Sequence, residues 1–313
     1  MTRLLVLLAV LLAAGAGRPA SALTYGLTPV RIAEDTWVFV GGTDHFTRAN
    51  GGNILNPGFI VTGDGVVVIQ TGPSRRFGEE MRAAIRKVTA EPIRIVYVGN
   101  LHPDYFLGAQ AFPDVPVAAL PGTIDGIRNE GAAIAGNMYR LVGDWMRGTE
   151  PVTPSHAVRG STVVIGTHRL RLIERHGHTA ADLAILDETT GVLFAGGLVF
   201  SDRTPTTPHA DIPAWLASLD ALAGLEFTTL VPNHGRIRSG ADAHAAIAET
   251  RDWLTWLDGT LRAAAAEGRD MAEMLDHPIP ERFHRMNVLR AEYQRSVAHL
   301  WPAIERETLP RIR

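Results

Sequence analysis

The chain has 313 residues, a formal charge of −3 and 46% hydrophobic residues, so it is long and apolar enough to bury a large core. Its mixed, nearly balanced charge argues against a nucleic-acid-binding surface. Cysteine is absent, which excludes disulfides, thiolate metal ligands and a cysteine nucleophile. The fold must therefore be held together by its core alone.

Residues 1–22 have the pattern of a secretory signal peptide. Arg3 gives a positive start, an apolar run follows from Leu4 to Ala14, and Ala20-Ser21-Ala22 is a small-x-small cleavage site. An uncleaved anchor is the alternative, but the run is shorter than the ~20 residues that span a bilayer. We expect a periplasmic or secreted protein with no membrane span after cleavage.

The first half of the mature chain alternates between strand and helix patterns. The helix expected at 75–89 has apolar residues spaced along one face. A strand at 93–98 is expected to end at a loop that begins with Asn100, and further helices are expected at 108–112 and 124–147. β-Branched and aromatic residues between turn signals predict an early antiparallel sheet of strands at 36–40, 58–61 and 65–69.

A second strand-rich half follows the Pro-containing passage at 151–154. Its expected strands lie at 161–165, 170–174, 183–186 and 192–195. After Gly240 the composition changes to helix formers, which predicts helices at 241–266 and 280–306. We interpret residues 23–240 as one domain and 241–313 as a helical extension, whose aromatic residues favour core or dimer packing over ligand binding.

The loop Asn100-Leu101-His102-Pro103-Asp104-Tyr105 resembles the metal-binding loop of the metallo-β-lactamase superfamily. That loop usually reads His-x-His-x-Asp-His, so Asn100 and Tyr105 stand where imidazoles are expected. The resemblance implies an α/β fold, a four-layer αβ/βα sandwich.

Four further motifs follow the order of the same family, over roughly residues 30–240. The turns at Gly177-His178-Thr179 and Pro232-Asn233-His234-Gly235 keep their histidines. Two other positions depart from the family, because Gly197 replaces a bridging Asp and Gln70 replaces the Asp of an Ile-Asp-Thr-Gly strand end. The family's dinuclear zinc site has seven ligands, of which the resemblance leaves His102, Asp104, His178 and His234.

Four ligands are compatible with one zinc ion but not with the full dinuclear centre. Hydrolytic zinc sites use about three imidazole or carboxylate ligands and leave one position open for the attacking water. We therefore expect a mononuclear hydrolase of an ester, thioester or amide bond. Asp104 is expected to act as general base or to orient the water, and Tyr105 to donate to the developing oxyanion.

The alternative is a fold that has kept its shape while the site has lost its metal. The four residual ligands would then persist as a hydrogen-bonded cluster in an accessory binding protein. The chain also resembles the SoxH-like branch, the quinoprotein relay system zinc metallohydrolases, through its export signal, its tail and residues 203–208. That resemblance implies a periplasmic quinoprotein partner.

Several other residues near these motifs are interpreted more plainly. Asp202 could swing in as a ligand, but a surface ion pair is favoured, and His45 is expected in a surface loop with a substrate contact as the alternative. His209 is expected to be an ordinary surface or turn residue. A small-molecule substrate is expected, and the aromatic tail makes a homodimer plausible.

Overall fold

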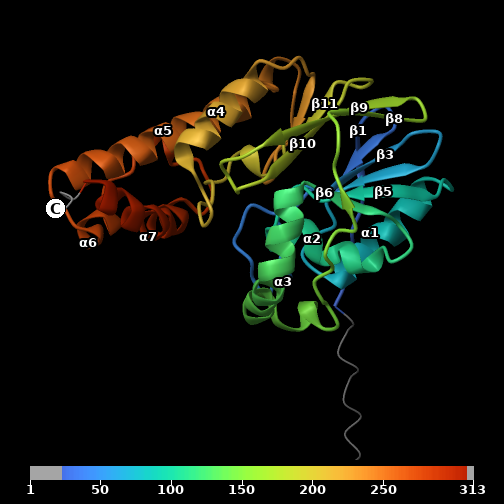
Figure 1. Ribbon diagram of the computed structural model, residues 1–313, viewed down its shortest axis with the longest axis horizontal. Coiled ribbons are helices and arrows are strands. Elements are labelled where there is room, and N and C mark those ends of the chain that lie inside the picture. Colours follow the sequence, from blue (N-terminus) through green and yellow to red (C-terminus); the bar gives the residue numbers. More distant parts are fainter. Residues whose placement is uncertain (1–22, 309–313) are drawn as a thin grey trace, which may run out of the picture.

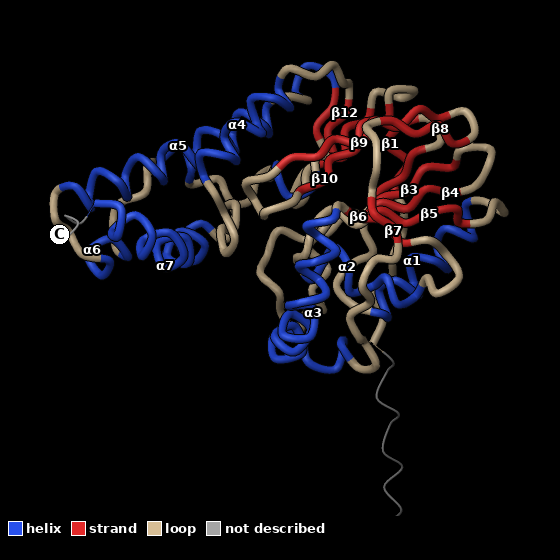
Figure 2. The backbone as a smooth tube through the Cα atoms, viewed as in Figure 1, coloured by secondary structure: helices blue, strands red, loops and turns tan. Residues whose placement is uncertain are grey.

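Two mixed β-sheets form the centre of the computed structural model, which describes residues 23–308 (Figure 1). The expected signal peptide, residues 1–22, lies outside the described residues. The sheets face one another, and helices cover their outer faces (Figure 2). This is the αβ/βα sandwich that the motifs implied.

The first sheet contains seven strands in the order of the sequence. Neighbours from β1 to β4 are antiparallel, whereas the pairs from β4 to β7 are parallel. The sequence predicted β2 to β5 and missed β1, β6 and β7. The strands are β1 (Val30–Ala33), β2 (Thr36–Val38), β3 (Gly58–Val61), β4 (Val66–Ile69), β5 (Ile93–Tyr97), β6 (Val117–Ala119) and β7 (His156–Ala157).

The second sheet contains six strands in the order β13-β12-β11-β10-β9-β8. Only the β11–β12 pair is parallel, because helix α4 connects these two strands. The strands are β8 (Thr162–Ile165), β9 (His168–Arg175), β10 (Asp182–Asp187), β11 (Val192–Phe194), β12 (Thr229–Val231) and β13 (Arg238–Ser239).

Three helices cover the first sheet. Helix α1 (Arg75–Val88) begins at Ser74, whose hydroxyl accepts from the Phe77 amide, and it buries the apolar face that the sequence predicted. Helix α3 (Pro121–Val142) confirms most of the helix expected at 124–147. The helix expected at 108–112 is instead the short α2 (Pro103–Phe106) followed by a 3₁₀ turn at Leu107–Ala111, because Pro103 starts the helix immediately after the loop.

Helix α4 connects two strands of the second sheet, and three more helices follow the sheet; together the four extend away from it as an arm (Figure 1). Helices α4 (Ile212–Ala223) and α6 (Met271–Leu275) were missed from the sequence, whereas α5 (Ala245–Ala266) and α7 (Leu289–Thr308) confirm the expected tail. One apolar cluster joins residues of β10, α4, α5 and α7. The helical extension therefore shares a core with the second sheet, which gives its aromatic residues a packing role within one chain.

The described residues hold three apolar layers. One lies between the two sheets, one under α1 to α3, and one under α4, α5 and α7. Among the described helices, none is both long and apolar enough to cross a membrane. The layers fix the sheets rigidly, so the loops at their shared edge hold side chains at defined positions.

Candidate metal site and cavity

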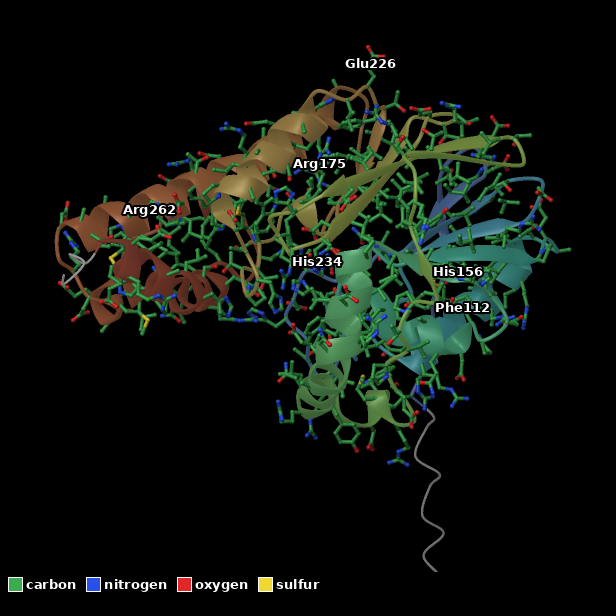
Figure 3. The ribbon with its side chains drawn as sticks, viewed as in Figure 1. Phe112, His156, Arg175, Glu226, His234 and Arg262 are labelled. Atoms are coloured by element: carbon green, nitrogen blue, oxygen red, sulfur yellow. The ribbon has the colours of Figure 1, made fainter. Side chains whose placement is uncertain are left out.

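The four residual ligands come from loops that follow β5, β9 and β12. His102 and Asp104 lie at the start of α2, His178 lies in the turn between β9 and β10, and His234 follows β12. Figure 3 labels His234 where the sheets, α3 and the helical arm come together. All four side chains are buried, with at most 8% of their surface exposed. The tertiary structure thus gathers at one edge the residues that the motifs had singled out.

His178 is held by Asp182, four residues later. Its Nδ1 donates to Asp182 Oδ1 over 3.3 Å, and Asp182 Oδ2 accepts from the Thr179 amide over 2.8 Å. Because Nδ1 carries the proton, Nε2 is a lone-pair acceptor, and this buried atom has no hydrogen-bond partner among the described residues. A carboxylate that fixes the tautomer of an imidazole is the arrangement that metal-binding histidines use.

His234 and Asp104 face one another. His234 Nδ1 donates to the Ile54 carbonyl over 2.6 Å, so its Nε2 is also an acceptor, and it lies 3.6 Å from Asp104 Oδ2. Asp104 Oδ2 is buried without a hydrogen-bond partner. Burial raises the pKa of Asp104 to about 6 and lowers the pKa of His234 well below 6.5. Two acceptors that face each other require a proton or a cation between them.

His102 packs edge to face against His178, with ring centroids 4.5 Å apart. Burial lowers the pKa of His102 well below 6.5, so the ring is neutral at pH 7. Its Nε2 lies 2.9 Å from Nδ1 of His209, which belongs to the loop between the 3₁₀ turn at Gly196–Leu198 and α4. His209 is exposed in a turn, as expected, and it also contacts a candidate ligand, which the sequence did not indicate.

Two of the residues that depart from the family pattern, Asn100 and Gln70, form side-chain hydrogen bonds within the protein. Asn100 Nδ2 donates to Asp182 Oδ1 over 3.1 Å, and Asn100 Oδ1 accepts from the His102 amide. Gln70 Oε1 accepts from the Gly99 amide over 2.9 Å. At Gly197 an added Cβ would lie 2.0 Å from Nδ1 of His178. The imidazole and Asn100 thus occupy the space next to the backbone where the family carries a bridging carboxylate.

Tyr105 does not line the cavity described below, and it is fully buried. Its hydroxyl makes no hydrogen bond, and burial next to the carboxylates of Asp104 and Asp182 raises its pKa well above 10. The expected contact with a substrate oxyanion therefore finds no support in this arrangement, because the phenol lies in the apolar layer under α1 to α3.

A cavity of about 690 Å³ opens above the ligands. His102, Asp104 and His234 line its polar end, while the side formed by α3 contributes apolar surface, including Ile134 and Leu141. The same cavity is lined by Phe46, Pro208 and His209 and by charged residues from the second half of the chain. A small molecule with one polar and one apolar part fits this division.

A buried charge network closes the cavity on the side of the arm. Glu292 of α7 lies 3.3 Å from Arg203 and 3.1 Å from His45, and both Glu292 and Arg203 are almost completely buried. His45 thus lies over the cavity, where a substrate contact remains a prediction. Asp202 pairs with Arg236 and Arg238, each at 3.1 Å, and does not approach the ligands.

The donor set fits a single cation in its chemistry. Nε2 of His178 and Oδ2 of Asp104 are buried acceptors without partners, which a cation would satisfy. Within residues 23–308, however, no three His, Cys, Asp or Glu side chains are already arranged as a set that could hold a metal ion. A bound ion would therefore need these side chains to rotate from the conformations that they have here.

Sequence reasoning missed three residues of this site: Arg203, His209 and Glu292. Glu292 had a signal in the sequence, because it lies one residue from Tyr293 on the apolar face of its helix, where an acid needs a buried partner. His209 and Arg203 had no comparable signal, since only the folded loop brings them to the cavity.

Comparisons with known proteins agree with this fold. A family model described as the metallo-beta-lactamase superfamily matches residues 51–234. The structure of a metallo-beta-lactamase from Pontibacter korlensis is 21% identical with a TM-score of 0.60, covering 73% of this chain and 99% of that one. The FIM-1 metallo-beta-lactamase from Pseudomonas aeruginosa, in its mono-zinc form, is 18% identical with a TM-score of 0.56, covering 72% and 95%.

One curated relative extends the comparison beyond lactamases. A linear primary-alkylsulfatase from a Pseudomonas species is 21% identical over 239 residues, which are 64% of this chain. The chain spans only 45% of the length of that relative. At these identities the solved structures show the shared fold and nothing finer.

Proposed function

Because the chain belongs to the metallo-beta-lactamase superfamily, we propose that it is a mononuclear metal-dependent hydrolase of a small molecule with an apolar part. The observation that carries the proposal is a pair of buried, unpartnered acceptors: Asp104 Oδ2, whose residue lines the polar end of the cavity, and His178 Nε2, whose ring packs against His102 of the same lining. His102, Asp104, His178 and His234 would hold one zinc ion. When bound, zinc supplies Lewis acidity and lowers the pKa of water to about 7.

The residues of the chain supply orientation and proton transfer. Asp104, with its pKa raised to about 6, is mostly ionised at pH 7 and can accept a hydrogen bond from the attacking water. Asp182 and the Ile54 carbonyl hold the rings of His178 and His234. The apolar side along α3 would orient the substrate and exclude bulk water from the scissile bond.

The lining of the cavity supports a proposal for the substrate class. An ester or thioester carbonyl at the polar end with an acyl chain along α3 matches the lining, and an amide is compatible with the same arrangement. The alkylsulfatase relative adds an alkyl sulfate ester to the substrates worth testing. We expect kcat/KM to rise with the length of the acyl chain, because a longer chain buries more apolar surface.

Metal content is the first test. Protein purified after growth with zinc, iron and manganese should carry about one equivalent of metal, and less than ~0.1 equivalent would rule the hydrolase out. His178→Ala should release the metal and abolish turnover of p-nitrophenyl esters.

A matched control separates metal loss from misfolding. His168 is a buried histidine that pairs with Asp187 over 2.9 Å, away from the four ligands. His168→Ala removes a comparable buried imidazole and should keep its metal. If both variants lose metal equally, or if His178→Ala keeps it, the ligand assignment is wrong.

A second candidate function is a metal-free binding protein. It is favoured by one observation, that no three potential ligands in the described residues are already arranged to hold an ion. Metal-free wild-type protein that binds acyl compounds in the cavity without turnover would support it. Export and a partnership with a periplasmic quinoprotein system also remain proposals, and N-terminal sequencing of protein from a periplasmic fraction tests export after Ala22.

A further inference from the structure

Each of the three candidate ligand histidines has one ring nitrogen held by a fixed partner. For His178 the partner is Asp182, and for His234 it is the Ile54 carbonyl. For His102 the contact is His209 Nδ1, 2.9 Å from Nε2. His102 is thus the only one of the three whose partner is another titratable ring, and that ring was not part of any motif.

The contact between the two rings determines which nitrogen of His102 stays available. One nitrogen of the pair must carry the proton, because a short contact between two lone pairs is repulsive. With Nε2 engaged by His209, Nδ1 is the ring nitrogen of His102 that remains to meet a cation. If Nε2–H donates to His209, Nδ1 is a lone-pair acceptor, as a metal ligand requires.

Helix α7 holds the loop that presents His209. The Thr207 hydroxyl, two residues before His209, donates to Ser296 over 3.0 Å, and both residues are buried. The amide of Thr204 in the same loop donates to the Asn287 carbonyl over 3.2 Å. On the other side of His209, the Asp211 amide donates to Gly177 next to His178. The loop is therefore anchored both to the helical extension and to the turn that carries a candidate ligand.

We propose that His209 is the positioning residue for His102: it accepts the Nε2 proton, leaves Nδ1 free for the cation, and is held in place by α7. This inference rests on the proposed function, because it takes His102 to be a metal ligand. The proposal gives the helical extension a part in the site, which the family's core motifs do not provide. It also compensates for Asn100, because His209 returns a second imidazole to this side of the cavity.

The test compares two substitutions at His209 with one control. His209→Gln keeps a side-chain acceptor that can take the Nε2 proton, whereas His209→Met has similar volume and no strong acceptor. His156→Met changes an exposed histidine on β7 outside the cavity. Zinc affinity is measured by competition with a chromophoric chelator. Ring tautomers are read in the metal-free protein from two-bond ¹H–¹⁵N spectra, with the His102 signals assigned by their loss in His102→Gln.

We expect wild-type His102 to carry its proton on Nε2, and His209→Met to lose this preference and bind zinc about 10–100-fold more weakly. His209→Gln should retain most of the affinity, and His156→Met all of it. Unchanged zinc affinity in His209→Met, or a proton on Nδ1 of wild-type His102, would overturn the inference while leaving the hydrolase proposal intact. If wild-type protein takes up no metal, the hydrolase proposal fails, and the tautomer comparison alone decides whether His209 orients His102.

Discussion

Two groups of polar side chains meet at the site, and they differ in how completely they are paired. The Asp182 carboxylate accepts from Asn100 Nδ2 and from the Thr179 amide, and Asn100 Oδ1 accepts from the His102 amide; we call this paired group the frame. By contrast, Asp104 Oδ2 and His178 Nε2 are buried and have no partner among the described residues. Of the two groups, only the first is satisfied by the protein alone.

On the proposed function, the difference separates residues that hold the fold from residues that would bind a cation. Substitution of the family's metal ligands by Asn100 and Gly197 did not leave orphaned groups, because neighbouring side chains pair with or fill that side of the site. The remaining acceptors carry a desolvation cost that a cation would remove. Stability measurements on single variants can therefore tell the two groups apart.

The largest expected effect follows from removing the centre of the frame. Asp182→Ala leaves the Thr179 amide, Asn100 Nδ2 and His178 Nδ1 without their acceptor, and should lower the free energy of unfolding by about 3–5 kcal/mol. Urea denaturation of the metal-free protein measures it. Asp187→Ala is the control, since Asp187 holds His168 in the same way outside the site and should cost stability without lowering zinc affinity. A loss below ~1 kcal/mol for Asp182→Ala would mean that the hydrogen bonds of Asp182 do not hold the fold together.

Asp104→Asn should have the opposite sign. In the folded, metal-free protein the pKa of Asp104 is raised from 3.8 to about 6, so the folded state favours the protonated form. The wild type therefore loses stability as the pH rises from about 4 through 6, by up to about 3 kcal/mol at pH 7. Asp104→Asn should be more stable than wild type at pH 7, equal to it near pH 3, and unable to retain metal.

Urea midpoints of the chelator-treated proteins across this pH range test the sign. If the stability of the wild type does not fall relative to that of Asp104→Asn between pH 4 and 7, Asp104 has a hydrogen-bond partner. It would then belong to the paired group around Asp182.

Gly197→Ala measures how tightly the frame is packed. An added Cβ would lie 2.0 Å from Nδ1 of His178 and 2.7 Å from Nδ2 of Asn100, so we expect a loss of about 1–3 kcal/mol. The matched control is Gly136→Ala in α3, where nothing lies within 4 Å and the helix should gain about 0.5–1 kcal/mol. Thermal unfolding of both variants gives the comparison, and equal stability changes would contradict the close packing of Gly197.

Tyr105→Phe should have the smallest effect. The tyrosine hydroxyl is buried without a partner, so its removal should leave stability unchanged or raise it by up to about 1 kcal/mol. Ester turnover should also be retained, since the phenol does not line the cavity. A drop in kcat of about 100-fold with unchanged KM would restore Tyr105 as an oxyanion donor.

Much of the fold was readable from the sequence because its signals are local. The apolar face at 75–88 and the β-branched runs at 58–61 and 66–69 predict their elements from spacing alone. Helix α4 had such a signal, which was missed: Ile212, Trp215 and Leu219 lie at helical spacing after the capping Asp211. The two-residue strands had none. Their conformations depend on packing with distant segments, which periodicity does not encode.

The sequence by itself determined the superfamily, the sandwich and the four candidate ligands, since their order along the chain is a property of the motifs. Only the tertiary structure decided which atoms of those residues are already paired. The pairing depends on side chains far apart in the chain, such as His209 against His102 and Glu292 against Arg203. Hydrogen bonding in a buried site is set by three-dimensional proximity, and for that reason the loop at Asn100 could be recognised from its residues but understood only in the fold.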